Sequence, residues 1–315
     1  MAIERVCVVG AGTIGSLFAG HLARVAEVTV LTRRHAQAAA LNESGLQVSG
    51  KSKLRARVTA SHEPEGIDDV DLAIVACKAV DLPGTAERLE GRFRRAAVMT
   101  VQNGLGAEEV VRLHGEWPLI SAVTFMSGTR RSDTHVEYEL DTATWMGPYM
   151  GGGPPYETVR ELESLLIAGG LEAEAMPDLR PAQWSKLIFN SAVNGVAALT
   201  DLPHVHAFAE EEEFADLGHL LRGLIDEGKA VAAAAGIELH DDPWEMNVRA
   251  VTRGETQRSD YAHIPSMLAD IRAHRPTEVD YISGALAREG ERLGVPVPLN
   301  TAIYRLVKAR EASWR

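Results

Sequence analysis

The first half of the chain alternates short apolar runs with stretches of helical spacing. Residues 3–9, 71–79 and 96–104 begin as apolar or β-branched runs, which is typical of strands buried on both faces. Helical spacing marks residues 16–24 and the amphipathic segment 155–170, which ends at two glycines. Further strands, some of them antiparallel, are predicted at 119–128, 135–140 and 142–147. This alternation predicts a parallel α/β domain.

Nearly all of the chain after residue 180 has helical spacing instead. Pro177 and Pro181 flank the change of pattern, so we place a boundary there, with domains at 1–178 and 179–315. The second domain is predicted to be all-helical, and the cleft between the domains is the expected functional site. The predicted helices cover 182–199, 210–236, 242–254, 264–273, 276–293 and 300–312.

Three glycines follow the first predicted strand and open the first helix. Gly10, Gly12 and Gly15 have the spacing G-x-G-x-x-G. The first permits a tight turn, the second lets backbone N–H groups approach a pyrophosphate, and the third allows close packing of helix on strand. Thr13 and Ile14 lie in the same loop, where the helix N-terminus favours phosphate. We interpret this half as a dinucleotide-binding Rossmann domain, against the alternative of a glycine turn that binds nothing.

The end of the second strand, residues 27–34, favours one dinucleotide over the other. An NAD site usually has a carboxylate here for the ribose 2′-hydroxyl, whereas a 2′-phosphate calls for arginine. This strand ends in Thr32, Arg33 and Arg34. A guanidinium binds a phosphate through charge-assisted hydrogen bonds. We therefore predict NADP(H) as the cofactor, with either arginine facing the phosphate; the alternative is a solvated basic turn.

Two more polar residues stand where predicted strands end. Lys78 follows the run that starts at Asp71, and Asn103 follows the run that starts at Ala96. The carboxyl ends of parallel strands line the ligand crevice of such a sheet, so both are candidate binding residues. Lys78 has the alternative of a surface lysine that starts a helix. Asn103 precedes a glycine and has the alternative of a turn residue.

A polar stripe runs along the first helix of the second half. Lys186, Asn190 and Asn194 recur at intervals of four, so they share one face of an otherwise apolar helix. Asparagine is a poor residue for a helix interior, which indicates a role beyond solubility. A lysine in a partly dry cleft can deliver a proton and stabilise a developing alkoxide, as the reduction of a carbonyl by hydride requires. The two asparagines are candidates for binding substrate oxygens.

Two further candidates lie near prolines in the last third of the chain. Ser266 follows Pro265, and Glu278 follows Pro276 and Thr277, each at a predicted helix start. Both have the ordinary interpretation of helix caps, with a first-turn carboxylate favoured by the helix dipole. Spacing alone does not decide between caps and site residues.

Charge and composition restrict the partners. Of 315 residues, 32 are Lys or Arg and 44 are Asp or Glu, giving a net charge of −12, which disfavours nucleic acid and anionic membranes. No apolar run reaches the roughly 18 residues of a membrane span, and no cationic leader precedes the first apolar run. Cys7 and Cys77 lie in apolar runs and make no metal site. We expect a cytoplasmic protein with a small-molecule partner.

The motifs occur in the order and approximate spacing of a known family. The glycine loop and the arginine after the second strand are followed by "CKA" at 77–79, "QNG" at 102–104, "WSKLIFNSAVN" at 184–194 and "PSMLADIRAHRPTEVDYISG" at 265–284. In this combination the sequence resembles the ketopantoate reductase family over essentially its whole length. The resemblance implies a Rossmann domain followed by a helical domain. It also implies NADPH-dependent reduction of a 2-keto acid, foremost 2-dehydropantoate (ketopantoate) to (R)-pantoate in pantothenate biosynthesis.

The same resemblance implies roles for the candidates. The position of Lys186 is the general acid, and that of Glu278 binds the substrate hydroxyl. The position of Ser266 holds the substrate carboxylate. At both Ser266 and Glu278 the resemblance therefore favours a site residue over a helix cap. The remaining roles are substrate orientation by Asn103, Asn190 and Asn194, and cofactor binding by Gly10, Gly12, Thr13, Ile14, Gly15, Arg33, Lys78 and Asn103. We also consider a homodimer through the helical domain.

The sequence departs from the family pattern at two places. His204 stands near a position where the family often has asparagine, and residues 136–147 replace a glycine-rich patch. These departures leave a reductase of another 2-keto acid as an alternative. A separate alternative is a β-hydroxyacid dehydrogenase, which also pairs a helix lysine with an asparagine four residues later but usually has glycines just before that lysine. An alternative of another class is a noncatalytic NADP-binding redox sensor, which has no need of Lys186 and Glu278.

Overall fold

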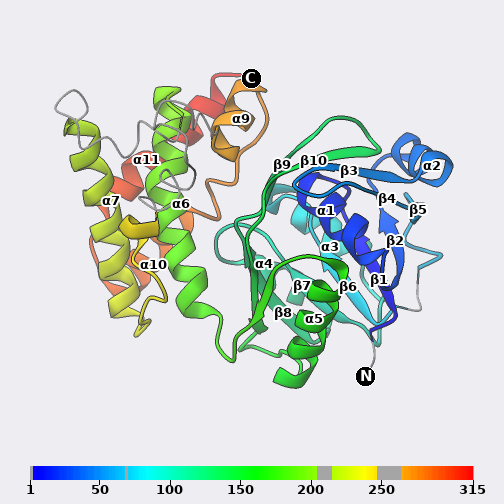
Figure 1. The fold of residues 1–315 in the computed structure, drawn as a ribbon. Coiled ribbons are helices and arrows are strands. Elements are labelled where there is room, and N and C mark those ends of the chain that lie inside the picture. The colour runs from blue at the N-terminus through cyan, green and yellow to red at the C-terminus, as the bar shows by residue number, and fades with distance from the viewer. Residues whose placement is uncertain (1–2, 68–69, 204–214, 247–263, 315) are drawn as a thin grey trace. The chain divides into compact units, whose positions relative to one another are not determined.

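The chain forms two compact units in the computed structural model (Figure 1), which describes residues 3–67, 70–203, 215–246 and 264–314. The first unit comprises residues 1–102 and 107–179, and the second comprises 103–106 and 180–315. The short loop 103–106 is therefore grouped with the helical second unit, although it follows a strand of the first. No helix in the described ranges is long and apolar enough to cross a membrane.

The first unit is built on a sheet of eight strands among the described residues. Their spatial order is β12-β11-β8-β7-β6-β1-β2-β5. Neighbouring strands run parallel except β8 and β11, which pair antiparallel. The strands are β1 (Arg5–Val9), β2 (Glu27–Leu31), β5 (Thr59–Ser61), β6 (Leu72–Val75), β7 (Ala97–Thr100), β8 (Leu119–Thr124), β11 (Thr144–Pro148) and β12 (Ala173–Ala175).

Alternation along β1 divides the core between the two faces of this sheet. Val6 and Val8 belong to one apolar cluster, together with side chains of α1 (Thr13–Leu22), α2 (His35–Ser44) and α5 (Tyr156–Gly169). Cys7 and Val9 belong to another, with side chains of α3 (Leu82–Arg88) and α4 (Ala107–Arg112). Because successive strand residues point to opposite faces, a nearly continuous apolar run is what a sheet covered on both faces requires. The predicted parallel α/β architecture is confirmed.

A second, four-stranded sheet was not predicted from the sequence. It has the order β4-β3-β10-β9, with strands β4 (Leu54–Ala56), β3 (Leu46–Gly50), β10 (His135–Leu140) and β9 (Ser127–Arg130). Helix α1 packs against β1 and β2 of the main sheet and also against β3, β4, β9 and β10. Gly20 of α1 allows this close approach, because a Cβ there would lie 2.8 Å from Cγ2 of Val48. The single predicted strand 119–128 is thus two strands, in different sheets.

The second unit is helical, as predicted. Its central helix is α6 (Arg180–Thr200), which packs against α7 (Ala215–Ala234), α9 (Ser266–Arg272), α10 (Ser283–Leu293) and α11 (Pro298–Ala312). Most residues from Ala182 to Ala198 are buried, because α6 has neighbours around it. Residues 243–246 are also helical. The predicted helices 210–236 and 242–254 lie partly outside the described residues, at 210–214 and 247–254.

One predicted helix begins later than expected. Residues 276–282 are not helical: a bend at Glu278 leads into turns at 279–282, and α10 starts only at Ser283. Its backbone groups bond elsewhere: the Thr277 N–H donates to Oε1 of Glu311 at 2.7 Å, and the Tyr281 carbonyl accepts from Leu105 N–H at 3.0 Å. Glu278 therefore lies in a turn, and its interpretation as a first-turn carboxylate of a helix is wrong.

Candidate functional site

The glycine loop lies directly after β1, where the polarity of the sheet places a nucleotide site. Gly10 has φ of 104°, and its N–H donates to the Leu31 carbonyl at 2.8 Å. A Cβ at Gly10 would lie 2.9 Å from the backbone nitrogen of Cys77, and one at Gly15 would lie 1.9 Å from the Gly10 carbonyl oxygen. Since β1 lies between β2 and β6, this loop is at the point where the strand order reverses.

Gly12 differs from the other two glycines because it faces open space. A Cβ built on Gly12 would meet no atom within 4 Å. Gly12 is also the N-cap of α1, and no side chain caps this helix. The first N–H groups of a helix need partners, and a phosphate supplies them. The open space at Gly12 and the N–H groups at the start of α1 therefore fit a pyrophosphate at this loop. Thr13 and Ile14 are the first two residues of that helix.

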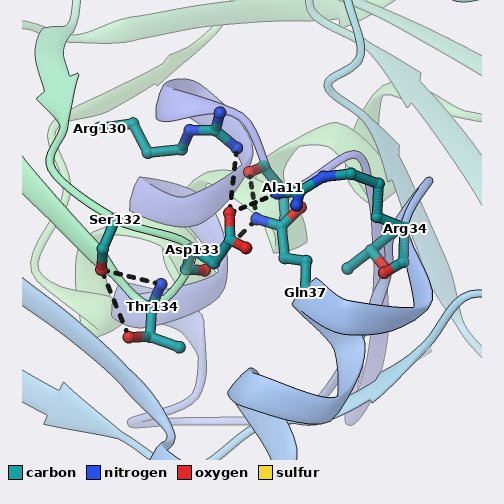
Figure 2. A network of polar contacts seen from close by, with 8 residues as sticks. Ala11, Arg34, Gln37, Arg130, Ser132, Asp133 and Thr134 are labelled. Carbon is teal, nitrogen blue, oxygen red and sulfur yellow. Dashed lines mark hydrogen bonds and ion pairs between the residues drawn. The ribbon is translucent and has the colours of Figure 1, made fainter.

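The two arginines after β2 have different surroundings. The turn that carries them is fixed by Thr32, whose hydroxyl donates to the Arg34 carbonyl at 2.9 Å. Arg33 is 77% exposed, and its Nη1 lies 3.1 Å from Oδ1 of Asp81. Arg34 instead forms an ion pair with Asp133, in the turn between β9 and β10 (Figure 2). The side chain of Arg33 is the more accessible of the two.

The carboxyl ends of β6 and β7 are joined by a residue that sequence reasoning missed. Gln102 donates through Nε2 to the carbonyl oxygens of Val75 and Cys77, at 2.8 and 2.9 Å. It thereby fixes the turn that carries Lys78, which is half-buried and precedes the short 3₁₀ helix η1 (Ala79–Asp81). Gln102 stands in the "QNG" motif directly before Asn103, and this motif is the signal in the sequence that points to it.

In the second unit, α6 brings the polar stripe together as predicted by its spacing. Lys186, Asn190 and Asn194 lie one turn apart along the same face, and each residue is only 6% exposed. Burying a lysine and two amides costs free energy unless they have partners in the folded or ligand-bound state. These three residues therefore form a buried polar face on an otherwise apolar helix.

Lys186 is electrostatically perturbed in this position. Burial lowers the pKa of Lys186 to about 8, and the nearby Glu278 carboxylate opposes part of that shift. Desolvation disfavours the charged ammonium, whereas a neighbouring negative charge favours it. The result is an amine that is mostly protonated at neutral pH and loses its proton just above it.

Glu278 is connected to Asn103 through the side chains. The amide Nδ2 of Asn103 donates to Oε2 of Glu278 at 3.1 Å. The connection is reinforced by the backbone, where Leu105 N–H donates to the Tyr281 carbonyl at 3.0 Å. Gly104, with φ of 96°, lies so close that a Cβ would be 2.0 Å from that carbonyl oxygen. The loop 103–106 is thus docked on the turn that carries Glu278.

The turn itself is anchored from α11. The Thr277 hydroxyl and N–H both donate to Oε1 of Glu311 at 2.7 Å, and Val279 N–H donates to the Thr277 hydroxyl oxygen at 3.3 Å. Thr277 is 1% exposed. Thr277 does not cap α10, which starts only at Ser283, and it anchors the turn instead. The anchoring carboxylate of Glu311 was not among the predicted residues.

Ser266 is not the N-cap of its helix. It is exposed, it is the first residue of α9, and the N-cap of that helix is Pro265, with no side-chain hydrogen bond to the helix. Because α9 packs against α6, Ser266 begins the helix next to the one that carries Lys186. Its role with a substrate stays a prediction. His204 lies outside the described residues.

Two protein-family models match the chain. The model described as "Ketopantoate reductase PanE/ApbA" matches residues 6–151, and the model described as "Ketopantoate reductase PanE/ApbA C terminal" matches residues 178–311. The two matches follow one another along the sequence and together span most of it. The family predicted from the ordered motifs is thereby confirmed.

Curated relatives match over almost their full length. A 2-dehydropantoate 2-reductase of Pyrobaculum aerophilum is 30% identical over 308 residues, which is 97% of both chains. That of Pyrococcus horikoshii is 29% identical over 308 residues, 98% of both chains, and that of Vibrio cholerae is 25% identical over 312 residues. Each match therefore covers almost all of this chain and of the relative.

Solved structures share the fold over the whole chain. A ketopantoate reductase of the PanE/ApbA family from Ralstonia eutropha has a TM-score of 0.85 at 26% identity, covering 98% of this chain and 99% of the other. A D-mandelate dehydrogenase, in a ternary structure with NADH and anilino(oxo)acetate, also has a TM-score of 0.85, at 24% identity and with 98% and 99% coverage. The family models and the full-length relatives agree, and the chain belongs to the ketopantoate reductase family of oxidoreductases.

Proposed function

We propose that this protein reduces 2-dehydropantoate to (R)-pantoate with NADPH as the hydride donor. The proposal is supported by the curated relatives, which are 2-dehydropantoate 2-reductases at 25–30% identity over almost the whole chain. The single observation that carries the chemistry is the buried Lys186, whose pKa is lowered to about 8. A general acid works best when its pKa lies near the operating pH, because a large fraction of it is then protonated and the proton is still transferred readily.

The reaction needs a hydride and a proton. When bound, the reduced nicotinamide supplies the hydride to the carbonyl carbon of the keto acid. As the C=O bond becomes C–O, negative charge grows on the oxygen, and Nζ of Lys186 stabilises it and then transfers a proton to it. The products are the 2-hydroxy acid, the oxidised nicotinamide and a neutral lysine, which regains its proton from solvent before the next turnover.

The other polar residues orient the substrate in this proposal. Glu278 accepts a hydrogen bond from the substrate hydroxyl, and Asn103 holds the Glu278 carboxylate through its 3.1 Å hydrogen bond. Asn190 and Asn194, on the same face of α6 as Lys186, bind substrate oxygens, and Ser266 binds the carboxylate. Holding reacting groups in a fixed geometry lowers the barrier by removing orientational entropy from the chemical step.

The cofactor side of the proposal rests on the first unit. The glycine loop and the N-terminus of α1 bind the pyrophosphate, and Lys78 adds positive charge at the end of β6. The exposed Arg33 binds the 2′-phosphate through charge-assisted hydrogen bonds, giving up its surface pair with Asp81.

Another 2-keto acid is the second candidate substrate. The fold is shared with a D-mandelate dehydrogenase, so the fold alone does not select the side chain of the acid. Lys186 and Ser266 are assigned to the carbonyl and the carboxylate, which all 2-keto acids have in common. The hydroxyl assigned to Glu278 is present in 2-dehydropantoate but absent from simpler 2-keto acids. The reaction type is therefore the same for both candidates.

A substrate panel tests the proposal. The purified protein is mixed with NADPH and in turn with 2-dehydropantoate, pyruvate, 2-ketoisovalerate and phenylglyoxylate, and the loss of NADPH absorbance is followed. We expect the largest kcat/KM with 2-dehydropantoate. A larger kcat/KM with phenylglyoxylate would favour the second candidate, and no oxidation with any acid would contradict the proposed reaction.

A further inference from the structure

A polar network joins the turn between β9 and β10 to the glycine loop (Figure 2). Asp133, in that turn, forms an ion pair with Arg34, and its Oδ1 lies 3.8 Å from Nη1 of Arg130. The Asp133 carbonyl oxygen accepts a hydrogen bond of 3.3 Å from Nε2 of Gln37. The same amide nitrogen donates to the carbonyl oxygen of Ala11, between Gly10 and Gly12, at 3.0 Å. Asp133 is thus linked to Arg34, after the end of β2, and through Gln37 to the glycine loop.

Arg34 is held more firmly than its neighbour. Its carbonyl oxygen accepts from the Thr32 hydroxyl at 2.9 Å, and its guanidinium pairs with a carboxylate that a second arginine also faces. The side chains of Arg34 and Asp133 are 48% and 33% exposed, compared with 77% and 45% for Arg33 and Asp81. A more exposed pair exchanges its partner for a phosphate at lower cost, because water already screens it.

The carboxylate of Asp133 also sets the local charge. A ribose 2′-substituent is expected at the end of β2, where Arg33 and Arg34 stand. Asp133 offsets positive charge from Arg34 and Arg130, which reach it from two different elements. Only Arg34 of these two stands directly after β2, so without that carboxylate Arg34 is the additional cation that a phosphate dianion would meet there.

We propose that Asp133 is a positioning residue that limits the preference of the nucleotide site for NADPH over NADH. It holds Arg34 in an ion pair, so that Arg33 is the arginine that binds the 2′-phosphate. Asp133 acts through Arg34 and does not itself touch the phosphate. The inference rests on the proposed function, because it takes the ligand at this edge to be the 2′-phosphate of NADPH.

The charge-removing variant Asp133→Asn tests this role. It keeps the size of the side chain and the backbone carbonyl that Gln37 binds, but it releases Arg34. We expect the ratio of the NADH and NADPH dissociation constants, measured by fluorescence titration, to rise about three- to tenfold, since a nearby unpaired cation attracts the additional phosphate. The rise should shrink in added salt, because ions screen an exposed charge.

Three companion variants separate charge from structural damage. Asp133→Glu keeps the charge and should retain the wild-type ratio. In the double variant Arg34→Gln/Asp133→Asn the rise should disappear, because the released cation is gone. Gln37→Met cuts both hydrogen bonds of the network, so it should weaken NADPH and NADH by the same factor and leave the ratio unchanged.

Two results would overturn the inference: an unchanged ratio in Asp133→Asn, or a rise that persists in the double variant. The proposed cofactor preference is tested separately, by the wild-type ratio itself. If the wild type binds NADH at least as tightly as NADPH, the proposed use of NADPH fails, while the shift between the wild type and Asp133→Asn still decides the role of Asp133.

Discussion

At the scale of single residues, Lys186 and Glu278 act on each other through charge. Burial favours the neutral amine of Lys186, and the carboxylate of Glu278 favours its charged form. The pKa of about 8 is the balance of these opposing effects. A change at Glu278 must therefore alter the proton affinity of Lys186, even though the lysine itself is untouched.

This coupling predicts a particular pH dependence. If Lys186 is the general acid, only its protonated form supports reduction, so kcat/KM should be level below pH about 8 and fall about tenfold per pH unit above it. In Glu278→Gln the opposing carboxylate is lost, so the pKa of Lys186 should fall and the decline should begin at lower pH. The measurement is kcat/KM for the keto acid across the pH range, for both proteins.

Two outcomes would contradict this prediction. A decline that begins at the same pH in Glu278→Gln would show that Glu278 does not influence the titrating group. A wild-type profile that stays level well above pH 8 would show that the proton comes from another residue. Lower overall activity of Glu278→Gln is expected and does not affect the shape of its profile.

At the scale of elements, the turn 276–282 and the loop 103–106 depend on each other. Gly104→Ala should disturb both, because its φ of 96° is unfavourable for alanine and its Cβ would lie 2.0 Å from the Tyr281 carbonyl oxygen. Backbone strain of this kind costs roughly 1–3 kcal/mol. Displacing the loop also misaligns Asn103 and Glu278, so kcat/KM should fall at least about tenfold.

Gly84 offers a matched control for that variant. It lies in α3, no positive φ is associated with it, and a Cβ there would meet no atom within 4 Å. Gly84→Ala should therefore leave kcat/KM unchanged and raise the free energy of unfolding by up to about 1 kcal/mol, since alanine favours helix. Equal activity of the two alanine variants would contradict a role for the loop.

The anchor on α11 supports a third prediction. Thr277→Val removes the hydroxyl that donates to Glu311, leaving a partly buried carboxylate oxygen with one donor fewer. We expect the free energy of unfolding to fall by about 1–3 kcal/mol and KM for the keto acid to rise, because Glu278 follows directly in the chain. Thr277→Ser keeps the hydroxyl and should restore KM. If KM in Thr277→Val matches the wild type, the anchor does not position Glu278.

Local features were predictable from the sequence at this scale, and features set by distant partners were not. The glycine loop after β1 and the polar stripe on α6 follow from spacing within one segment. The late start of α10 depends instead on two residues far away in the sequence. Glu311 accepts a hydrogen bond from the Thr277 N–H, and Leu105 donates one to the Tyr281 carbonyl. The pairing of β3 with β10 and the ion pair of Arg34 with Asp133 are equally non-local. Periodicity carries no information about such partners.

At the scale of the whole molecule, the two units carry different parts of the proposed reaction. The glycine loop and Arg33 belong to the first unit, whereas Lys186, Asn103 and Glu278 belong to the second. Cofactor binding and proton transfer should therefore respond to different substitutions. The grouping of Asn103 with the helical unit was not visible in the sequence, where it directly follows a strand of the first unit.

In the proposed reaction, Lys186 supplies the proton when NADPH reduces the keto acid. The most direct measurement compares wild type and Lys186→Met for kcat with 2-dehydropantoate and for the dissociation constant of NADPH. Losing a general acid should lower kcat by roughly 100-fold or more, while NADPH binds about as tightly as before. A variant whose kcat stays within a few-fold of wild type, with 2-dehydropantoate fully reduced, would contradict the account.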